Sequence, residues 1–242
     1  MIKEAVQYLV TLGETKKNVE IIDHEGRRYT DRSIHAMTEP VVSAIKVSTL
    51  SGLCDLIGND CKVEGFSSDH YLVHVVDHEH VQVIAKRSNH WKQREVLVDC
   101  TPEETKQFVF GQFVPHEQFT IGLLSQFKDS GDREHVLKIS SNVTNEAVVV
   151  SADDGISQRL TVNQSVALKS EVVVRTVKLA PWRTFNEVEQ PTSEFILRAK
   201  NDNNTTKLAL FESDGGRWKL EAIENIARYL RQAAPEKTTV IS

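Results

Sequence analysis

Hydrophobic residues recur at helical spacing near both ends of the chain. Apolar side chains at i, i+3 and i+4 predict helices over residues 2–12, 48–57 and 217–234. Gly13 is expected to end the first helix, and Pro235 is expected to stop the last one.

The helix predicted over residues 48–57 has the clearest apolar face. Ser48 or Thr49 supplies a hydroxyl that is suited to an N-cap. The apolar positions that follow are Leu50, Leu53, Cys54 and Ile57. Because Cys54 lies among them, we expect a buried and inert thiol rather than a nucleophile.

The middle of the chain carries two further helix signals. Thr101 followed by Pro102 and Glu104 has the composition of a capping box, so we expect a helix to start there. Hydrophobic residues placed on one side predict another helix over residues 116–128; they are Phe119, Leu123, Leu124 and Phe127.

Alternating polarity and β-branched runs predict strands elsewhere. A hairpin is expected around residues 23–26, where Gly26 is available for a positive φ. The other predicted strands are 71–76, 81–86, 94–99, 136–140, 147–151, 157–162, 166–178, 195–200 and 207–211. The first three of these are expected to form a meander, and the last two a hairpin.

This order of elements predicts an α+β fold. The N-terminal half is expected to be helix-rich with a β-meander, and the C-terminal half to be an antiparallel, sheet-rich part closed by a C-terminal helix. Residues 1–242 contain no repeat, low-complexity run or flexible linker. We therefore expect a single domain, with a division into two subdomains near residue 130 left open.

Composition indicates a soluble protein of a reducing compartment. The 29 basic and 34 acidic residues leave a net charge of −5, which argues against a basic nucleic-acid-binding domain. The three cysteines, the absence of a leader pattern at the start, and the absence of about 18 consecutive apolar residues favour the cytoplasm.

Histidines and acids cluster between residues 69 and 80. Imidazoles and carboxylates ligate zinc, iron or manganese, and a strand-turn-strand unit would place His78 and His80 on the same side. The weak metal candidates are His74, His78 and His80, while His70 completes the cluster. Because no third ligand has a recognised spacing, a polar hairpin tip is favoured; we expect no bound metal and no cofactor.

Motifs of catalysis are missing from the sequence. It contains no phosphate-binding loop, dinucleotide fingerprint or nucleophile elbow. The acidic-glycine stretches at 153–155 and 214–216 are expected to be turns that need a positive φ. An enzyme, such as a metal-dependent hydrolase at the histidine cluster, is therefore the less favoured interpretation.

One short stretch combines basic and aromatic residues. Cations that contact phosphates and a ring that stacks on bases are typical of single-strand binders. The candidate residues for nucleic-acid contact are Arg87, Trp91, Lys92 and Arg94. The alternative is an inward-packed Trp91 at the end of a hairpin, and the negative net charge favours it.

The stretch from Ala180 to Trp218 holds two of the three tryptophans, between turn residues. Interfaces are enriched in aromatic side chains and arginine. The candidate interaction residues are Trp182, Arg183, Phe185, Glu187, Asp214, Arg217 and Trp218. The equally weighted alternative is an internal packing corner in which Arg183 pairs with Glu187 or Glu189.

Parts of the sequence resemble a tailed-phage and prophage protein family of unknown function. The segments that carry the resemblance are 48–57, 153–158, 181–191 and 212–218, so that it extends over nearly the whole chain. The resemblance implies a soluble, phage-encoded protein made in the bacterial host cytoplasm. It implies no catalytic residues.

We therefore expect a non-enzymatic homo-oligomer that acts through protein–protein contacts, in an assembly or on a host factor. The alternatives are an accessory nucleic-acid-binding protein of phage recombination or replication, and a counter-defence protein that sequesters a nucleotide signal or host effector. The β-branched end, residues 238–241, is expected to add a strand to a sheet edge of the same or another subunit.

Overall fold

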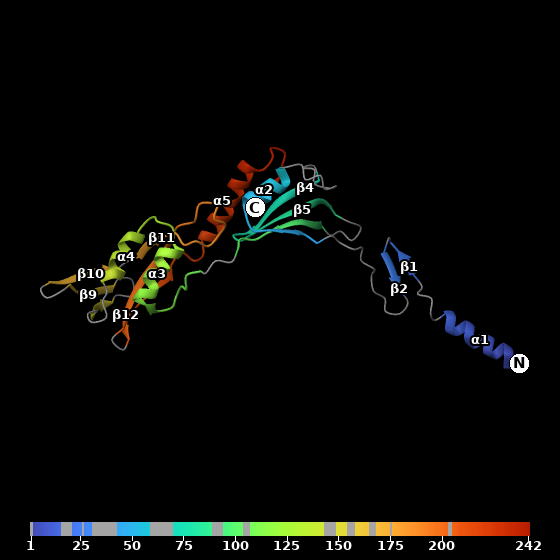
Figure 1. Ribbon diagram of the computed structural model, residues 1–242, viewed down its shortest axis with the longest axis horizontal. Helices are drawn as coiled ribbons and strands as arrows, with labels where there is room; N and C mark the ends of the chain where they lie inside the picture. Colours follow the sequence, from blue (N-terminus) through green and yellow to red (C-terminus); the bar gives the residue numbers. More distant parts are fainter. Residues whose placement is uncertain are drawn as a thin grey trace. The chain divides into compact units, whose positions relative to one another are not determined.

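The structure is a computed structural model (Figure 1), and its residues form two compact units, 1–43 with 88–95 and 44–87 with 96–242. The residues that it describes are 2–15, 21–25, 27–30, 43–58, 70–88, 94–103, 107–142, 149–153, 158–164, 168–174, 176–202 and 205–242. Residue 130 lies inside the second unit.

The described residues of the first unit form one helix and one hairpin. Helix α1 covers Ile2–Thr15, and strands β1 (Ile21–His24) and β2 (Arg27–Thr30) pair antiparallel. The expected helix and hairpin are confirmed, but the predicted end of the helix was wrong. The helix continues through Gly13, because a glycine inside a helix costs only about 1 kcal/mol. In the turn, a positive φ of 52° occurs at Glu25, and Gly26 lies outside the described residues.

A five-stranded sheet with the order β14-β4-β5-β6-β3 forms one part of the second unit. Its strands are β3 (Ile45–Val47), β4 (Tyr71–Asp77), β5 (His80–Ser88), β6 (Arg94–Cys100) and β14 (Val240–Ile241). The predicted meander is thereby confirmed. The sheet is mixed, because both edge strands run parallel to their neighbours.

Helices α2 (Leu50–Gly58) and α5 (Trp218–Ala233) pack together on this sheet (Figure 1). Both were predicted. Alternation along β4 buries Tyr71, Val73 and Val75 against them. The resulting sheet core also contains all four apolar positions of α2, together with Val81, Val83, Val98, Cys100, Phe185, Val188, Ile226, Ala227 and Leu230.

A second hydrophobic core lies around an antiparallel sheet with the order β11-β12-β13-β7. Its strands are β7 (Val114–Pro115), β11 (Thr176–Leu179), β12 (Ser193–Asp202) and β13 (Thr205–Glu212), and its helices are α3 (His116–Gln126) and α4 (Arg133–Asn142). The phenylalanine-rich core between them includes Phe108, Phe119, Phe127, Phe195, Leu208 and Leu210. The predicted hairpin of residues 195–211 is confirmed.

A further antiparallel sheet has the order β10-β9-β8. Its strands are β8 (Val149–Asp153), β9 (Gln158–Gln164) and β10 (Leu168–Val174). The single long strand predicted over 166–178 is instead divided between β10 and β11, which belong to different sheets. In the part of the chain that the structure describes, five helices and these sheets confirm the α+β class.

Three local predictions were wrong. Residues 136–140 lie in helix α4 rather than in a strand, because Val136, Ile139 and Ser140 face the core at helical spacing. Residues 101–103 have no helical structure, so the capping-box composition does not start a helix there. Leu124 is exposed, unlike its predicted core neighbours on α3.

Candidate functional site

Residues 180–191 connect the two hydrophobic cores of the second unit. Leu179, at the end of β11, lies in the phenylalanine-rich core. The chain then places Phe185 and Val188 in the sheet core, and returns to the phenylalanine-rich core with Phe195 on β12. This route makes the segment one of the covalent and packing links between both cores.

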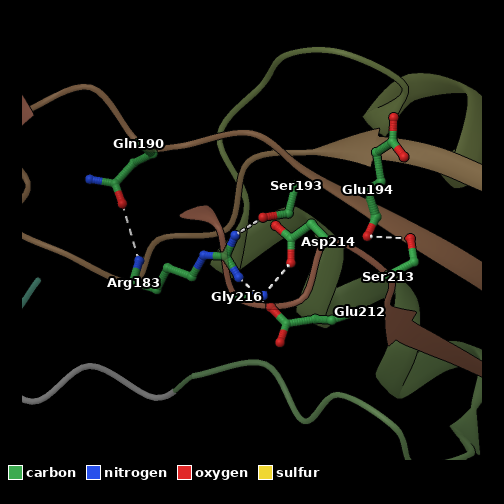
Figure 2. Close-up of polar contacts among 8 residues, drawn as sticks. All are labelled: Arg183, Gln190, Ser193, Glu194, Glu212, Ser213, Asp214 and Gly216. Carbon is green, nitrogen blue, oxygen red and sulfur yellow. Dashed lines mark hydrogen bonds and ion pairs between the residues drawn. The ribbon is translucent and has the colours of Figure 1, made fainter. Parts of the chain in front are cut away.

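Arg183 lies at the centre of this link (Figure 2). Its backbone N–H donates to Gln190 Oε1 at 3.1 Å, which closes the loop. Its guanidinium donates to Glu212 Oε1 at 2.5 Å and to the Ser193 hydroxyl, so it contacts both strands of the β12–β13 hairpin. The same guanidinium stacks on Trp218 with 3.7 Å between Cζ and the ring centroid.

Trp218 is contacted by the histidine of the β4–β5 turn as well. The His78 ring meets the indole edge-on, with 4.7 Å between ring centroids. The Thr184 hydroxyl donates to the His78 carbonyl, which fixes the turn against the link segment. Burial lowers the pKa of His78 below its ordinary value, while the neighbouring Glu79 carboxylate opposes this shift.

The partners predicted for Arg183 were wrong. Arg183 pairs with Glu212, which follows it by 29 positions, and with neither of the two nearby glutamates. Glu187 accepts hydrogen bonds from the N–H groups of Leu50 and Ser51 at the start of α2. Glu189 forms an exposed ion pair with Lys128 at 3.6 Å.

The predicted interaction residues divide between interior and surface. Phe185 is 0 %, Arg183 6 % and Trp218 8 % exposed, so their side chains offer almost no area to a partner. The other four reach the surface to different extents; Trp182, Glu187 and Asp214 are half-buried, and Arg217 is exposed. Contact of these four with another protein stays a prediction.

The acidic-glycine stretch at 214–216 is a turn, as predicted. Gly216 N donates to Asp214 Oδ1 at 3.0 Å, and Gly215 and Gly216 have φ values of 64° and 79°. Side chains other than glycine are strained at such positions. The other predicted turn, at 153–155, lies largely outside the described residues.

The four histidines of the predicted cluster have different surroundings in the structure. His70 is exposed, and His74 lies on β4 beside the C-terminal strand. His78 contacts Trp218, whereas His80 donates from Nε2 to Asp99 Oδ1 on β6. Among the described residues, no three His, Cys, Asp or Glu side chains are grouped to hold a metal ion.

A cavity of about 1050 Å³ lies beside the link segment and contains the His80 imidazole. Carboxylates dominate its charged lining, which consists of Asp77, Glu79, Glu103, Glu187, His80 and Arg183. Asp99 orients His80, and the hydrogen bond from His80 lowers the pKa of Asp99. Such a lining suits a cationic or hydroxyl-rich molecule better than a phosphate, because like charges repel.

Sequence reasoning did not select Asp99 or Gln107. Asp99 binds both His80 and Gln82, and Gln107 Nε2 donates to Glu79 Oε1 at 3.1 Å. The alternation of β6 predicts that Asp99 lies on the face opposite Val98 and Cys100. No local signal connects it to a histidine 19 positions earlier.

Arg183 also lines a smaller cavity of about 380 Å³. Its lining combines aromatic and charged side chains, among them Phe108, Phe110, Trp182, Trp218, Lys219 and Glu212. Two of these groups are already engaged by Arg183, since Glu212 neutralises the guanidinium and Trp218 stacks on it. Lys219 also lies over the Trp218 ring, with 5.7 Å between Nζ and the ring centroid, so the charged groups of this lining are largely engaged with one another.

The predicted basic patch is only partly described. Arg87 and Arg94 are exposed near the adjacent ends of β5 and β6. Trp91 and Lys92 lie outside the described residues. Nucleic-acid contact by these residues stays a prediction.

The two described cysteines are buried and free. Burial raises the pKa of Cys54 to about 11 and that of Cys100 to about 12. The prediction of an inert Cys54 agrees with this environment, because only thiolates are nucleophilic.

No family model, curated protein sequence or solved structure matches the chain. No described helix is both long enough and apolar enough to cross a membrane.

Proposed function

We propose that the protein is a non-enzymatic, phage-encoded protein that self-associates in the host cytoplasm and acts through protein–protein contacts. The contacts build an assembly or capture a host factor. The phage setting is supported by the sequence resemblance. Self-association is supported by the apolar face of α1.

Within its unit, α1 leaves its apolar side chains exposed. Val6 is 53 %, Leu9 67 % and Val10 51 % exposed, and the three follow i, i+3, i+4 spacing. Tyr8 and Leu12 lie beside them and are also exposed. A helix of 14 residues is only marginally stable by itself in water, since most helical stability comes from packing of the apolar face.

A second copy of the chain is the partner that this face fits. The face itself carries no charge; Lys3 flanks it one turn before Val6, whereas Glu4, Gln7 and Thr11 lie on the opposite side. Two identical apolar stripes can cover each other about a two-fold axis, which is the commonest symmetry of homo-oligomers.

Sedimentation velocity of the full chain tests this proposal. The wild-type chain is expected to sediment as an oligomer at tens of micromolar. Val6→Lys with Leu9→Lys should lower the assembly state, because two cations on the apolar face oppose its burial. Gln7→Lys with Thr11→Lys adds the same charge to the polar face and should leave the assembly state unchanged.

A wild-type chain that sediments at its monomer mass of 27.3 kDa would contradict the proposal. Equal loss of assembly in both double variants would also contradict it, because the effect would then follow charge rather than the apolar face.

A further inference from the structure

The last residues of the chain form an edge strand of the five-stranded sheet. Val240 and Ile241 pair in parallel with Val73 and His74 of β4. Val73 N–H also donates to the Thr239 carbonyl at 2.9 Å. The predicted strand addition by residues 238–241 is thus confirmed within one chain.

This strand is attached to the fold by few contacts. Its ladder covers two positions of the seven-residue β4. Val240 is half-buried against the sheet core, whereas Ile241 is 41 % exposed. Residues 234–239 join it to α5 through a turn in which Thr238 N–H donates to the Pro235 carbonyl at 2.8 Å. An edge strand with so short a ladder opens more easily than the interior of the sheet.

We propose that the β4 edge is an acceptor site for this C-terminal strand, and that the strand exchanges between copies. The C-terminal strand of one copy pairs with β4 of a second copy, and the C-terminal strand of the second copy pairs with β4 of the first. This inference rests on the proposed self-association and names a segment that carries it.

Exchange is favoured because donor and acceptor are present in every copy. Each contact that Val240 and Ile241 make within one chain is reproduced between two chains, so exchange of the identical segment has a low cost. Residues 234–239 reach about 20 Å when extended, at roughly 3.3–3.6 Å per residue. The end of α5 in one copy must therefore lie within that distance of the β4 edge of the other copy. Filling the edge also protects β4 from unspecific strand pairing.

Cysteines at positions 74 and 241 can distinguish exchange of the strand between copies from pairing of the strand with β4 of its own chain. His74 and Ile241 are register partners on neighbouring strands. Neighbouring strands lie about 4.7–4.9 Å apart, which is within the roughly 4.4–6.8 Å between Cα atoms of disulfide-linked residues. A full chain that carries both His74→Cys and Ile241→Cys should form an internal disulfide. This variant shows that the geometry permits the bond.

The test mixes two full-length chains, one with His74→Cys and the other with Ile241→Cys, in a glutathione buffer. Peptide mapping by mass spectrometry should find an interchain 74–241 disulfide. Its yield should exceed at least tenfold that from His74→Cys mixed with Glu236→Cys, whose cysteine is exposed in the tail but unpaired with β4.

A complete internal disulfide together with no excess of the interchain link would overturn strand exchange. If the wild-type chain self-associates in sedimentation in that case, the proposed function stands and only the exchange is lost. A monomeric wild-type chain without the link overturns both.

Discussion

At the scale of single residues, Arg183 explains why the segment around it is rich in aromatic and charged side chains. A buried Arg183, 6 % exposed, needs partners for its donors: Nη1 and Nη2 donate to Glu212 and Ser193, and the guanidinium stacks on Trp218, while Nε has no hydrogen-bond partner among the described residues. The aromatic and charged side chains that suggest an interface in the sequence therefore pack inside the protein, where they hold residues 180–191 between the two cores.

Replacement of Arg183 by Met should lower the free energy of unfolding by about 1.5–3 kcal/mol, as for other lost hydrogen bonds to charged groups. The loss arises because the hydrogen bonds of the guanidinium to Glu212 and Ser193 and its stacking on Trp218 disappear, whereas the Glu212 carboxylate is 35 % exposed and stays hydrated. Urea unfolding with an unchanged m-value would measure it. Arg217→Met, at an exposed position, should change the free energy by less than about 0.5 kcal/mol.

His78 should make stability depend on pH. Its pKa in the folded chain is lowered by burial from the ordinary value of 6.5, so the unfolded chain binds the proton first on acidification. The free energy of unfolding should therefore be highest above pH 6.5 and fall as the pH drops from there toward the folded pKa. Urea unfolding between pH 8 and 5 would measure this slope.

The matched variants are His78→Gln and His70→Gln. The slope should flatten in the former and persist in the latter, since His70 is exposed. An unchanged slope in His78→Gln would contradict the prediction. Asp99, whose pKa is lowered chiefly by His80, loses its contribution only below 3.8 and does not interfere in this range.

At the scale of elements, α2 shows how local and distant residues complete the same helix. The Thr49 hydroxyl accepts from Gly52 N–H at 3.1 Å, which confirms one of the two predicted N-caps. Glu187 accepts from Leu50 N–H at 2.9 Å and places a negative charge at the helix N-terminus. Three N–H groups that a helix leaves unpaired are thereby satisfied.

Loss of the Glu187 side chain should destabilise the protein through this helix end. We expect Glu187→Ala to lower the free energy of unfolding by about 1–2 kcal/mol, as for other lost helix caps. Hydrogen exchange at Leu50 and Ser51 should accelerate in parallel. Glu189→Ala removes only an exposed ion pair with Lys128 and should cost less than about 1 kcal/mol. Equal effects of both substitutions would contradict the capping role.

At the scale of the whole molecule, self-association and strand exchange concern different parts of the chain. The apolar face of α1 belongs to the first compact unit, and the C-terminal strand belongs to the second. The sedimentation and disulfide experiments therefore report on separate surfaces. If both contacts form, each copy offers two interfaces, which is what growth beyond a dimer requires.

The sequence by itself determined the α+β class and the elements whose burial pattern is local. Two kinds of pattern repeat within a few residues and can therefore be recognised in the sequence. They are the apolar spacing of α2 and α5 and the alternation along β4, β12 and β13. The β-branched side chains of residues 136–140 predict a strand. Only the tertiary structure decided that these residues are helical, because Val136 and Ile139 both pack into the phenylalanine-rich core at helical spacing. It also decided the partners of Arg183 and Glu187 and the place of the C-terminal strand. Leu50 and Glu187 are 137 positions apart, and contacts of that kind depend on how the chain folds back on itself rather than on any local pattern.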